Sequence, residues 1–188
     1  MRRRQMAFTV TELLVTLTLV ALLFNLGLPR IHSTVQQQAG AALLSDLTRS
    51  MSFARAAAVS TGRMITLCRS ANGSSCGGQW QDGILVFTDT NADRKANGSD
   101  RILRYTAFRH RAGTLQLRSF PNRQYVQFSP LGFTNKQNGS FTWCPPGGDA
   151  ALAQQLVFTQ SGRTRSARDL DGDGIREDSQ GKPLSCAN

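Results

Sequence analysis

The most apolar part of the chain lies near its beginning. Apolar side chains run from Phe8 to Leu28, and Glu12, several threonines and Asn25 interrupt them. At about 1.5 Å per residue, a helix over this run would be roughly 31 Å long, which is close to the hydrocarbon thickness of a bilayer. The basic stretch Arg2–Arg4 precedes the run and predicts that its N-terminal end faces the cytoplasm. We therefore predict a single-pass membrane helix.

The next segment also has a helical period. Between Pro29 and Ser60, apolar residues recur at intervals of three and four, which is typical of an amphipathic helix. Thr61 and Gly62 then supply a signal that ends a helix. The pattern predicts one long helix, about Phe8–Ser60, whose second half lies on a head domain. Its apolar positions are Val35, Ala39, Ala42, Leu43, Leu47, Met51, Ala54 and Ala58.

From Arg63 onward the pattern changes to short alternating runs. Turn signals such as Asn72-Gly73 and Asp82-Gly83 separate these runs. One helix followed by seven strands predicts an α+β fold with an antiparallel sheet packed on the helix. The Gly- and Asp-rich stretch Asp171–Gly181 is predicted to be a loop or tail. The predicted strands are Met64–Arg69, Ile84–Thr88, Ile102–Phe108, Thr114–Phe120, Tyr125–Ser129, Ser140–Cys144 and Gln155–Gln160.

The chain is strongly basic. It has 22 Lys and Arg against 12 Asp and Glu, a formal net charge of +10, and most of the basic residues are Arg. Such an excess suits a polyanionic partner without identifying it. The two histidines, His32 and His110, belong to no Ser/His/Asp order and to no metal-binding spacing. We therefore predict that the protein is not an enzyme and that it uses no metal or other cofactor.

The start of the apolar run carries a specific motif. Met6–Val15, with the sequence MAFTVTELLV, resembles the class III signal of type IV pilins and type II secretion pseudopilins. The resemblance implies that prepilin peptidase cuts between Ala7 and Phe8 and that the new N-terminus is methylated. It also implies that Glu12 pairs with the N-terminal amine of a neighbouring subunit, which agrees with the need of an intramembrane carboxylate for a cationic partner. The family normally has Gly where this chain has Ala7.

A second motif lies in the predicted head. Trp80–Asn91 and Asp100–Arg104 resemble a pattern of the GspH/FimT family of minor pilins and pseudopilins: W-x-x-G-φ-x-φ-F-x-D-x-N, a polar loop, then an acid and a φ-φ-R strand, where φ is apolar. The resemblance implies a type IV pilin-like fold with a leader (1–7), a transmembrane and assembly helix (8–29) and a β-rich head (30–188). It also implies an inner-membrane subunit with a periplasmic head, which reaches the cell surface in an assembled pilus. Its partners would be prepilin peptidase and other minor and major pilins.

The four cysteines form no C-x-x-C pair and have no histidines at metal-binding spacing, so zinc is not predicted. An exported head lies in an oxidising compartment, where an even number of cysteines indicates two disulfides. Three pairings are possible. We favour Cys68–Cys76 across a turn-rich loop, together with Cys144–Cys186, which would tie the C-terminal tail to the sheet.

Two Asp-rich loops partly match calcium-binding loops. Asp169, Asp171 and Asp173 match the start of an EF-hand loop, but Gln180 takes the twelfth position, where a bidentate Glu belongs. Residues 89–100 give a second partial match, with Arg94 in place of the required Gly. The alternative for both loops is a solvated set of Asx turns. We favour this alternative and predict no metal.

The last basic cluster follows an apolar strand. Ser161-Gly162 predicts a tight hairpin turn, and on the returning strand the period of two places Arg163 and Arg165 on one face, about 6.6 Å apart. Arg168 can reach the same partner from the tail. Guanidinium groups hold phosphate oxygens in a fork, and nothing here reads bases, so we predict sequence-independent, salt-dependent binding of double-stranded DNA. This G-R-x-R sequence also resembles the C-terminal motif of DNA-binding FimT-type minor pilins that act in natural transformation.

Two alternatives to this DNA site stay open. A Ser-Gly-Arg hairpin is only a turn in family members without a DNA role, and the nearby aspartates 169, 171 and 173 could fold back and neutralise the arginines. A second basic segment, Arg101–Arg123, contains no acid, and part of it would act as an electrostatic funnel. Its members are Arg101, Arg104, Arg109, Arg111, Arg118 and Arg123.

The sequence thus predicts a minor pilin that binds DNA non-specifically for uptake in natural transformation. The DNA-binding residues would be Gly162, Arg163, Arg165 and Arg168. One alternative is a structural minor pilin that primes pilus assembly. Another is a GspH-like pseudopilin of type II secretion.

Overall fold

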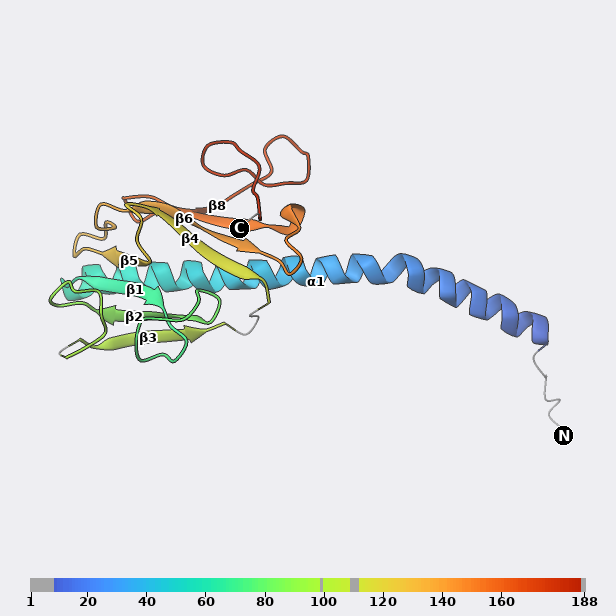
Figure 1. The fold of residues 1–188 in the computed structure, drawn as a ribbon, viewed down its shortest axis with the longest axis horizontal. Helices are drawn as coiled ribbons and strands as arrows, with labels where there is room; N and C mark the ends of the chain where they lie inside the picture. Colours follow the sequence, from blue (N-terminus) through green and yellow to red (C-terminus); the bar gives the residue numbers. More distant parts are fainter. Residues whose placement is uncertain (1–8, 99, 109–111, 187–188) are drawn as a thin grey trace. The chain divides into compact units, whose positions relative to one another are not determined.

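The structure is a computed structural model that describes residues 9–98, 100–108 and 112–186. The chain divides into two compact units, residues 1–36 and 37–188. Figure 1 shows the elements, which are α1 (Val10–Thr61), β1 (Ile65–Arg69), β2 (Gly83–Thr88), β3 (Ile102–Ala107), β4 (Thr114–Phe120), β5 (Tyr125–Phe128), β6 (Asn138–Cys144), the 3₁₀ helix η1 (Ala150–Leu152), β7 (Gln154–Phe158) and β8 (Thr164–Ser166).

The first unit consists of the N-terminal part of α1. The Thr9 hydroxyl accepts from the backbone N–H of Glu12 at 3.3 Å, so Thr9 caps the helix. The Thr16 and Thr18 hydroxyls donate to carbonyls three or four residues earlier, so these polar groups are satisfied within the helix. No helix within the described residues is both long enough and apolar enough to cross a membrane. The transmembrane assignment of residues 8–29 stays a prediction.

The second unit holds two antiparallel sheets of four strands. Their strand orders are β3-β2-β1-β5 and β4-β6-β7-β8. The sequence predicted one antiparallel sheet; two form because β4 pairs with β6, whereas β5 returns to β1. Figure 1 shows both sheets alongside the second half of α1. The predicted α+β class, with a long helix packed on antiparallel strands, is confirmed.

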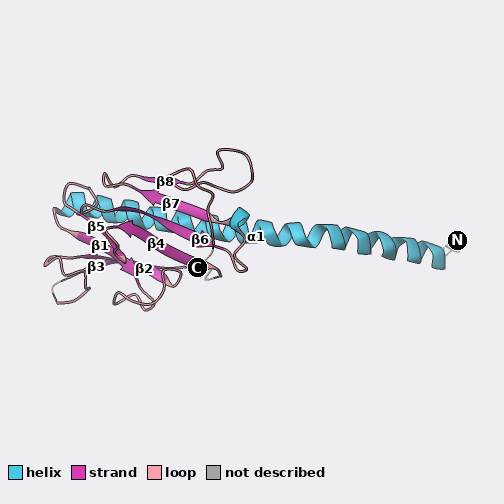
Figure 2. Ribbon diagram, turned by 45° about the horizontal axis from the view of Figure 1, so that its top comes forward, coloured by secondary structure: helices cyan, strands magenta, loops and turns pink. Residues whose placement is uncertain are grey.

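The strand bounds differ from the predicted ones by up to two residues. The sixth strand begins at Asn138, two residues earlier than predicted, because Asn138 and Gly139 pair with Phe120 and Ser119 of β4. The seventh strand ends at Phe158 instead of Gln160, because the chain turns at Thr159. The return segment is regular enough to form an eighth strand, β8, beside β7 (Figure 2).

One core joins the helix to both sheets. The helix contributes a buried stripe at spacings of three and four, as its pattern predicts from Leu43 onward; of the earlier positions in that pattern, Val35 and Ala42 are exposed and Ala39 is half-buried. Gly40 is buried, and a Cβ there would lie 2.5 Å from the Trp143 ring, so only glycine lets α1 pass this close to β6. The stripe is Leu43, Leu47, Met51, Ala54 and Ala58; its partners include Ile65, Leu67, Ile84, Val86, Val126 and Phe128 of the first sheet and Leu115, Leu117, Phe141, Leu156 and Phe158 of the second.

Both favoured disulfides form. Cys68–Cys76 closes the loop after β1, and Cys144–Cys186 ties the tail to the end of β6. Leu184 of the tail is buried with Ala153 and Ala167, so apolar packing supports the second bridge. The tail is thereby fixed to the second sheet, directly after the residues of the predicted DNA site.

Candidate nucleic-acid interface

The predicted DNA site lies on the β7–β8 hairpin. The turn is closed by two backbone hydrogen bonds: the Thr159 N–H donates to Arg163 O at 3.0 Å, and the Gly162 N–H donates to Thr159 O at 2.9 Å. The predicted turn at Ser161-Gly162 is therefore present. Strands β7 and β8 on either side of this turn pair with each other in register. The backbone that carries Arg163 and Arg165 is therefore held by the sheet.

Gly162 shapes this hairpin. It is buried and has φ +74°, in the left-handed region that disfavours side chains. A Cβ at this position would lie 2.6 Å from the carbonyl oxygen of Gly132 and 3.3 Å from the side chain of Arg55. Gly162 therefore allows two loops and the helix to approach one another. Its contacts make it a structural residue of the hairpin, with no side chain to offer a ligand.

The register of β8 assigns its side chains to two faces. Thr164 pairs with Phe158 and Ser166 with Leu156, and both partners belong to the core. Cross-strand partners share a face, so Thr164 and Ser166 point toward the helix side of the sheet. Arg165 pairs with Val157 and points to the opposite, outer face.

Arg163 lies one residue before β8, so strand alternation does not fix its direction, and the shared face predicted for Arg163 and Arg165 stays a prediction. It lines a groove with Thr164 and with Ser52, Arg55 and Val59 of α1. Arg55 therefore adds a second guanidinium to the surroundings of Arg163. The sequence did not predict Arg55 as part of this site. Nothing in the helical pattern around Arg55 indicates that it lies beside a hairpin more than a hundred residues later in the chain.

The three arginines of the predicted site are available to a ligand. Arg163, Arg165 and Arg168 are all exposed. Across the described parts of the chain, the only ion pair joins Asp46 and Arg49. In this structure the aspartates of the tail therefore form no ion pair with the hairpin arginines, in contrast to one of the alternatives that the sequence left open.

The register also brings one distant arginine into line with the hairpin. Arg118 of β4 pairs with Ser140, Ser140 with Val157, and Val157 with Arg165. The four residues form one row on the outer face of the second sheet. At about 4.8 Å per strand, the backbones of Arg118 and Arg165 are roughly 14 Å apart.

The outer face also has a groove beside Arg118. Ser140 and Thr142 line it from β6, and Asp178 and Lys182 line it from the tail. The two tail residues carry opposite charges, so the net charge that they add to this groove is small. The arginines at the two ends of the row therefore supply the basic character of this face.

The other described arginines of the 101–123 segment do not lie together on one surface. Arg101 and Arg104 are exposed on the first sheet, and the Arg104 guanidinium lies 4.1 Å from the centre of the Phe53 ring. Arg123 is half-buried and donates to Asn135 O at 3.0 Å. Arg109 and Arg111 lie outside the described residues. Among the described arginines of this segment, only Arg118 shares the sheet face of Arg165.

The Asp-rich loop at residues 89–100 is held by its own hydrogen bonds. Buried Asp89 accepts from Thr66 Oγ1 at 2.6 Å, from Gln127 Nε2 at 2.7 Å and from the Arg94 N–H. The pKa of Asp93 is lowered, chiefly because the Asn97 side-chain amide donates to its carboxylate and also because the Lys95 N–H does. These donors occupy the carboxylates and indicate a structural role for this loop.

The processing and assembly residues lie at the beginning of the chain. Ala7 and Phe8 are outside the described residues, and Glu12 is exposed in the first turn of α1. Their roles stay predictions.

A long N-terminal helix packed on antiparallel sheets is the type IV pilin-like fold that the sequence predicts, and two crystal structures share it. Both are of the type IV minor pilin FimU from Pseudomonas aeruginosa strain PAO1. The first, in space group P21, has a TM-score of 0.52 and 21% identity, over 82% of this chain and 96% of that one. The second, in P65, has a TM-score of 0.50 and 20% identity, over 78% and 98%. At these identities the likeness shows the fold alone.

The family is shown by sequence. The family described as Type II transport protein GspH matches residues 44–162, which is more than half of the chain. The chain therefore belongs to the GspH family. No curated protein matches it.

Proposed function

We propose that this GspH-family subunit is a minor pilin that binds double-stranded DNA through its phosphate backbone, for uptake in natural transformation. The observation that carries the proposal is the set of exposed guanidiniums on the β7–β8 hairpin, Arg163, Arg165 and Arg168, which form no ion pair within the described residues. Guanidinium forks match phosphate oxygens in shape and charge.

The geometry suits a backbone contact better than base reading. The hairpin carries a strand of only three residues, and no helix or long ribbon extends from it toward a groove of DNA. Arg118, at the other end of the outer row, would contact phosphates about four base pairs further along the duplex axis, at an axial rise of roughly 3.4 Å per base pair. Binding is therefore independent of sequence and declines steeply with salt.

A few phosphate contacts give weak binding for each subunit. Neighbouring copies or other subunits of a filament would raise the effective concentration of sites along one DNA molecule. Assembly follows the pilin scheme: prepilin peptidase cuts between Ala7 and Phe8, and the Glu12 carboxylate pairs with the new N-terminus of a neighbouring pilin. The inner membrane holds the subunit before assembly. Mass spectrometry of the mature N-terminus tests the cut.

The DNA proposal is tested by titrating labelled duplexes of two unrelated sequences with the full chain in detergent micelles. Fluorescence anisotropy at low salt should give equal affinities for the two duplexes. The Arg163→Gln/Arg165→Gln variant should bind at least about tenfold more weakly, since each charged hydrogen bond contributes roughly 1.5–3 kcal/mol.

The matched control is Arg101→Gln/Arg104→Gln, which removes the same charge from the first sheet. It should keep nearly the original affinity. Equal losses in both variants would mean that net charge alone drives binding, and unaltered binding by the hairpin variant would refute the site.

The second candidate function is that of a type II secretion pseudopilin. The matching family description, Type II transport protein GspH, favours it. In this role, or in that of a pilus-priming subunit, the hairpin is structural and its arginines are solvated. The full chain would then show no DNA binding at low salt.

A further inference from the structure

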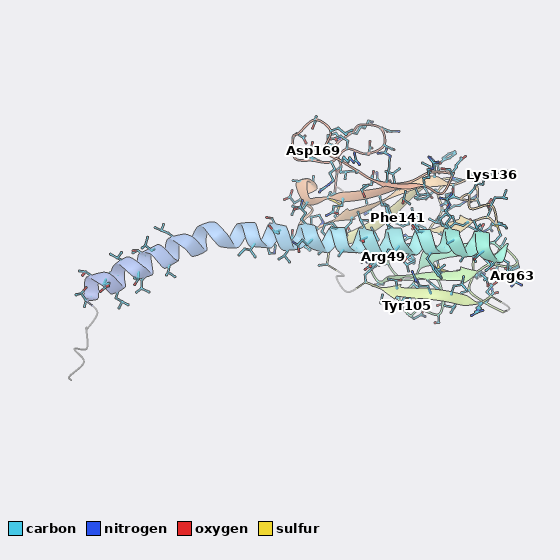
Figure 3. The ribbon with its side chains drawn as sticks, turned by 180° about the vertical axis from the view of Figure 1, so that it is seen from behind. Arg49, Arg63, Tyr105, Lys136, Phe141 and Asp169 are labelled. Carbon is cyan, nitrogen blue, oxygen red and sulfur yellow. A yellow bond between two sulfur atoms is a disulfide. The ribbon has the colours of Figure 1, made fainter. Side chains whose placement is uncertain are left out.

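The Asp-rich loop at residues 169–177 gathers four carboxylates, whereas the sequence motif names only three. Asp169, Asp171, Asp173 and Glu177 each place one carboxylate oxygen within 4.8 Å of the other three. Glu177 takes part because its backbone N–H donates to Arg168 O at 3.0 Å, which returns the chain beside the start of the loop. Figure 3 shows Asp169 in a loop that projects from the second sheet.

The environment of Glu177 distinguishes this cluster from an ordinary solvated loop. Its side chain is 5% exposed. Oε2 accepts from the Leu170 N–H at 2.6 Å, whereas Oε1 is buried and has no hydrogen-bond partner among the described residues. A buried carboxylate oxygen without a partner is strongly unfavourable unless a cation or a donor meets it. The aspartates clustered with Glu177 add three more carboxylate oxygens, which are all acceptors, so a cation is the partner that would satisfy the four carboxylates together.

We propose that Asp169, Asp171, Asp173 and Glu177 bind a calcium ion. Calcium takes oxygen ligands at about 2.3–2.6 Å, so two ligands of one ion lie at most roughly 5 Å apart, and the observed 4.8 Å limit agrees with this distance. The donors are all oxygens and no histidine lies in this loop, which disfavours zinc and other transition metals. The Glu takes the ninth position of the loop, where an EF-hand has it at the twelfth.

The backbone of the loop is already arranged around the carboxylates. Asp169 accepts from the N–H groups of Gly172 at 2.7 Å and Gly174 at 3.0 Å, and Asp173 accepts from the Ile175 N–H at 2.7 Å. These bonds hold the side chains on the inside of the turn. The other acidic cluster, Asp89/Asp93/Asp100, differs because donors already occupy its buried carboxylate.

A bound calcium ion would stabilise the tail and reduce its negative charge. The loop connects β8 to the segment that the Cys144–Cys186 bridge fixes, so an ion would hold the two ends of this connection together. The four carboxylates carry four negative charges, and a bound calcium ion would reduce the net charge of the loop to two negative. This change would occur directly after the hairpin arginines in the chain. The site itself does not depend on DNA binding, and its test is separate.

The experiment is a calorimetric titration of the oxidised full chain, stripped with a chelator in detergent micelles, with CaCl₂. One ion should bind per chain, with a Kd on the order of 10⁻⁴–10⁻³ M, as in extracellular calcium modules. Asp171→Asn and Glu177→Gln should each weaken binding by roughly 10-fold or more. MgCl₂ should bind far more weakly.

The control is Asp178→Asn, which removes one charge from the same tail outside the cluster. It should bind calcium as the original chain does. Absence of saturable binding at millimolar calcium would overturn the proposal, and so would binding that survives both ligand substitutions. Equal binding of magnesium would overturn the choice of calcium. Because Asp171 is exposed, its variant remains informative even if Glu177→Gln fails to fold.

Discussion

Replacing Gly162 with Ala tests how the hairpin is built. The new Cβ would stand 2.6 Å from the Gly132 carbonyl oxygen, on backbone at φ +74°. The left-handed conformation costs about 1 kcal/mol for alanine, and overpacking against backbone adds roughly 1–3 kcal/mol. We expect a loss of about 3 kcal/mol in the free energy of unfolding, which lowers the melting temperature by roughly 6–12 °C for a chain of this size.

The assay is thermal unfolding of the oxidised full chain, followed by circular dichroism. Gly62→Ala is the matched control, because Gly62 has φ +64° and an added Cβ would meet nothing within 4 Å. It should lose only about 1 kcal/mol, from backbone strain alone. If Gly162→Ala melts no lower than Gly62→Ala, the close approach of the hairpin to Gly132 is not a constraint, and our account of this glycine is refuted.

Three further predictions concern the tail, an acidic loop and the sheet. Replacing Cys144 and Cys186 with Ser should cost about 4 kcal/mol in urea denaturation, from the 42-residue separation of the bridge; an unaltered midpoint would contradict this. Because folding lowers the pKa of Asp93 through the Asn97 amide, its contribution is complete above pH 3.8 and is lost as the pH falls through the folded pKa; an NMR titration midpoint at or above 3.8 would contradict this. Arg118→Gln should lower DNA affinity less than the hairpin double substitution does, and an equal or larger loss would shift the site toward β4.

Local patterns predicted much of this fold. The helix, seven strands and the turn at Ser161-Gly162 follow from period, glycine and turn chemistry, which act over a few residues. The pairing Cys68–Cys76 is also local. The division into two sheets depends on β4 pairing with β6 and on β5 pairing with β1, and such non-local choices leave no mark in the period of either strand.

The candidate sites were predicted only in part, for the same reason. The hairpin arginines could be proposed from the sequence because they are neighbours in the chain. Arg118 joins the row of Arg165 only through three strand pairings, and Arg55 approaches Arg163 only through helix packing. Glu177 was missed because the loop was compared with EF-hand spacing, in which a Glu at the ninth position is not the expected bidentate ligand.

The salt dependence of DNA binding tests the central claim most directly. We would measure the association constant of the full chain and of Arg163→Gln/Arg165→Gln over a range of salt concentrations. Each lost phosphate contact should reduce the slope of log K against log salt by about 0.9, so the slopes should differ by roughly 2. Equal slopes would mean that these two arginines contact no phosphate, and the hairpin would then be a structural turn of a GspH-family subunit.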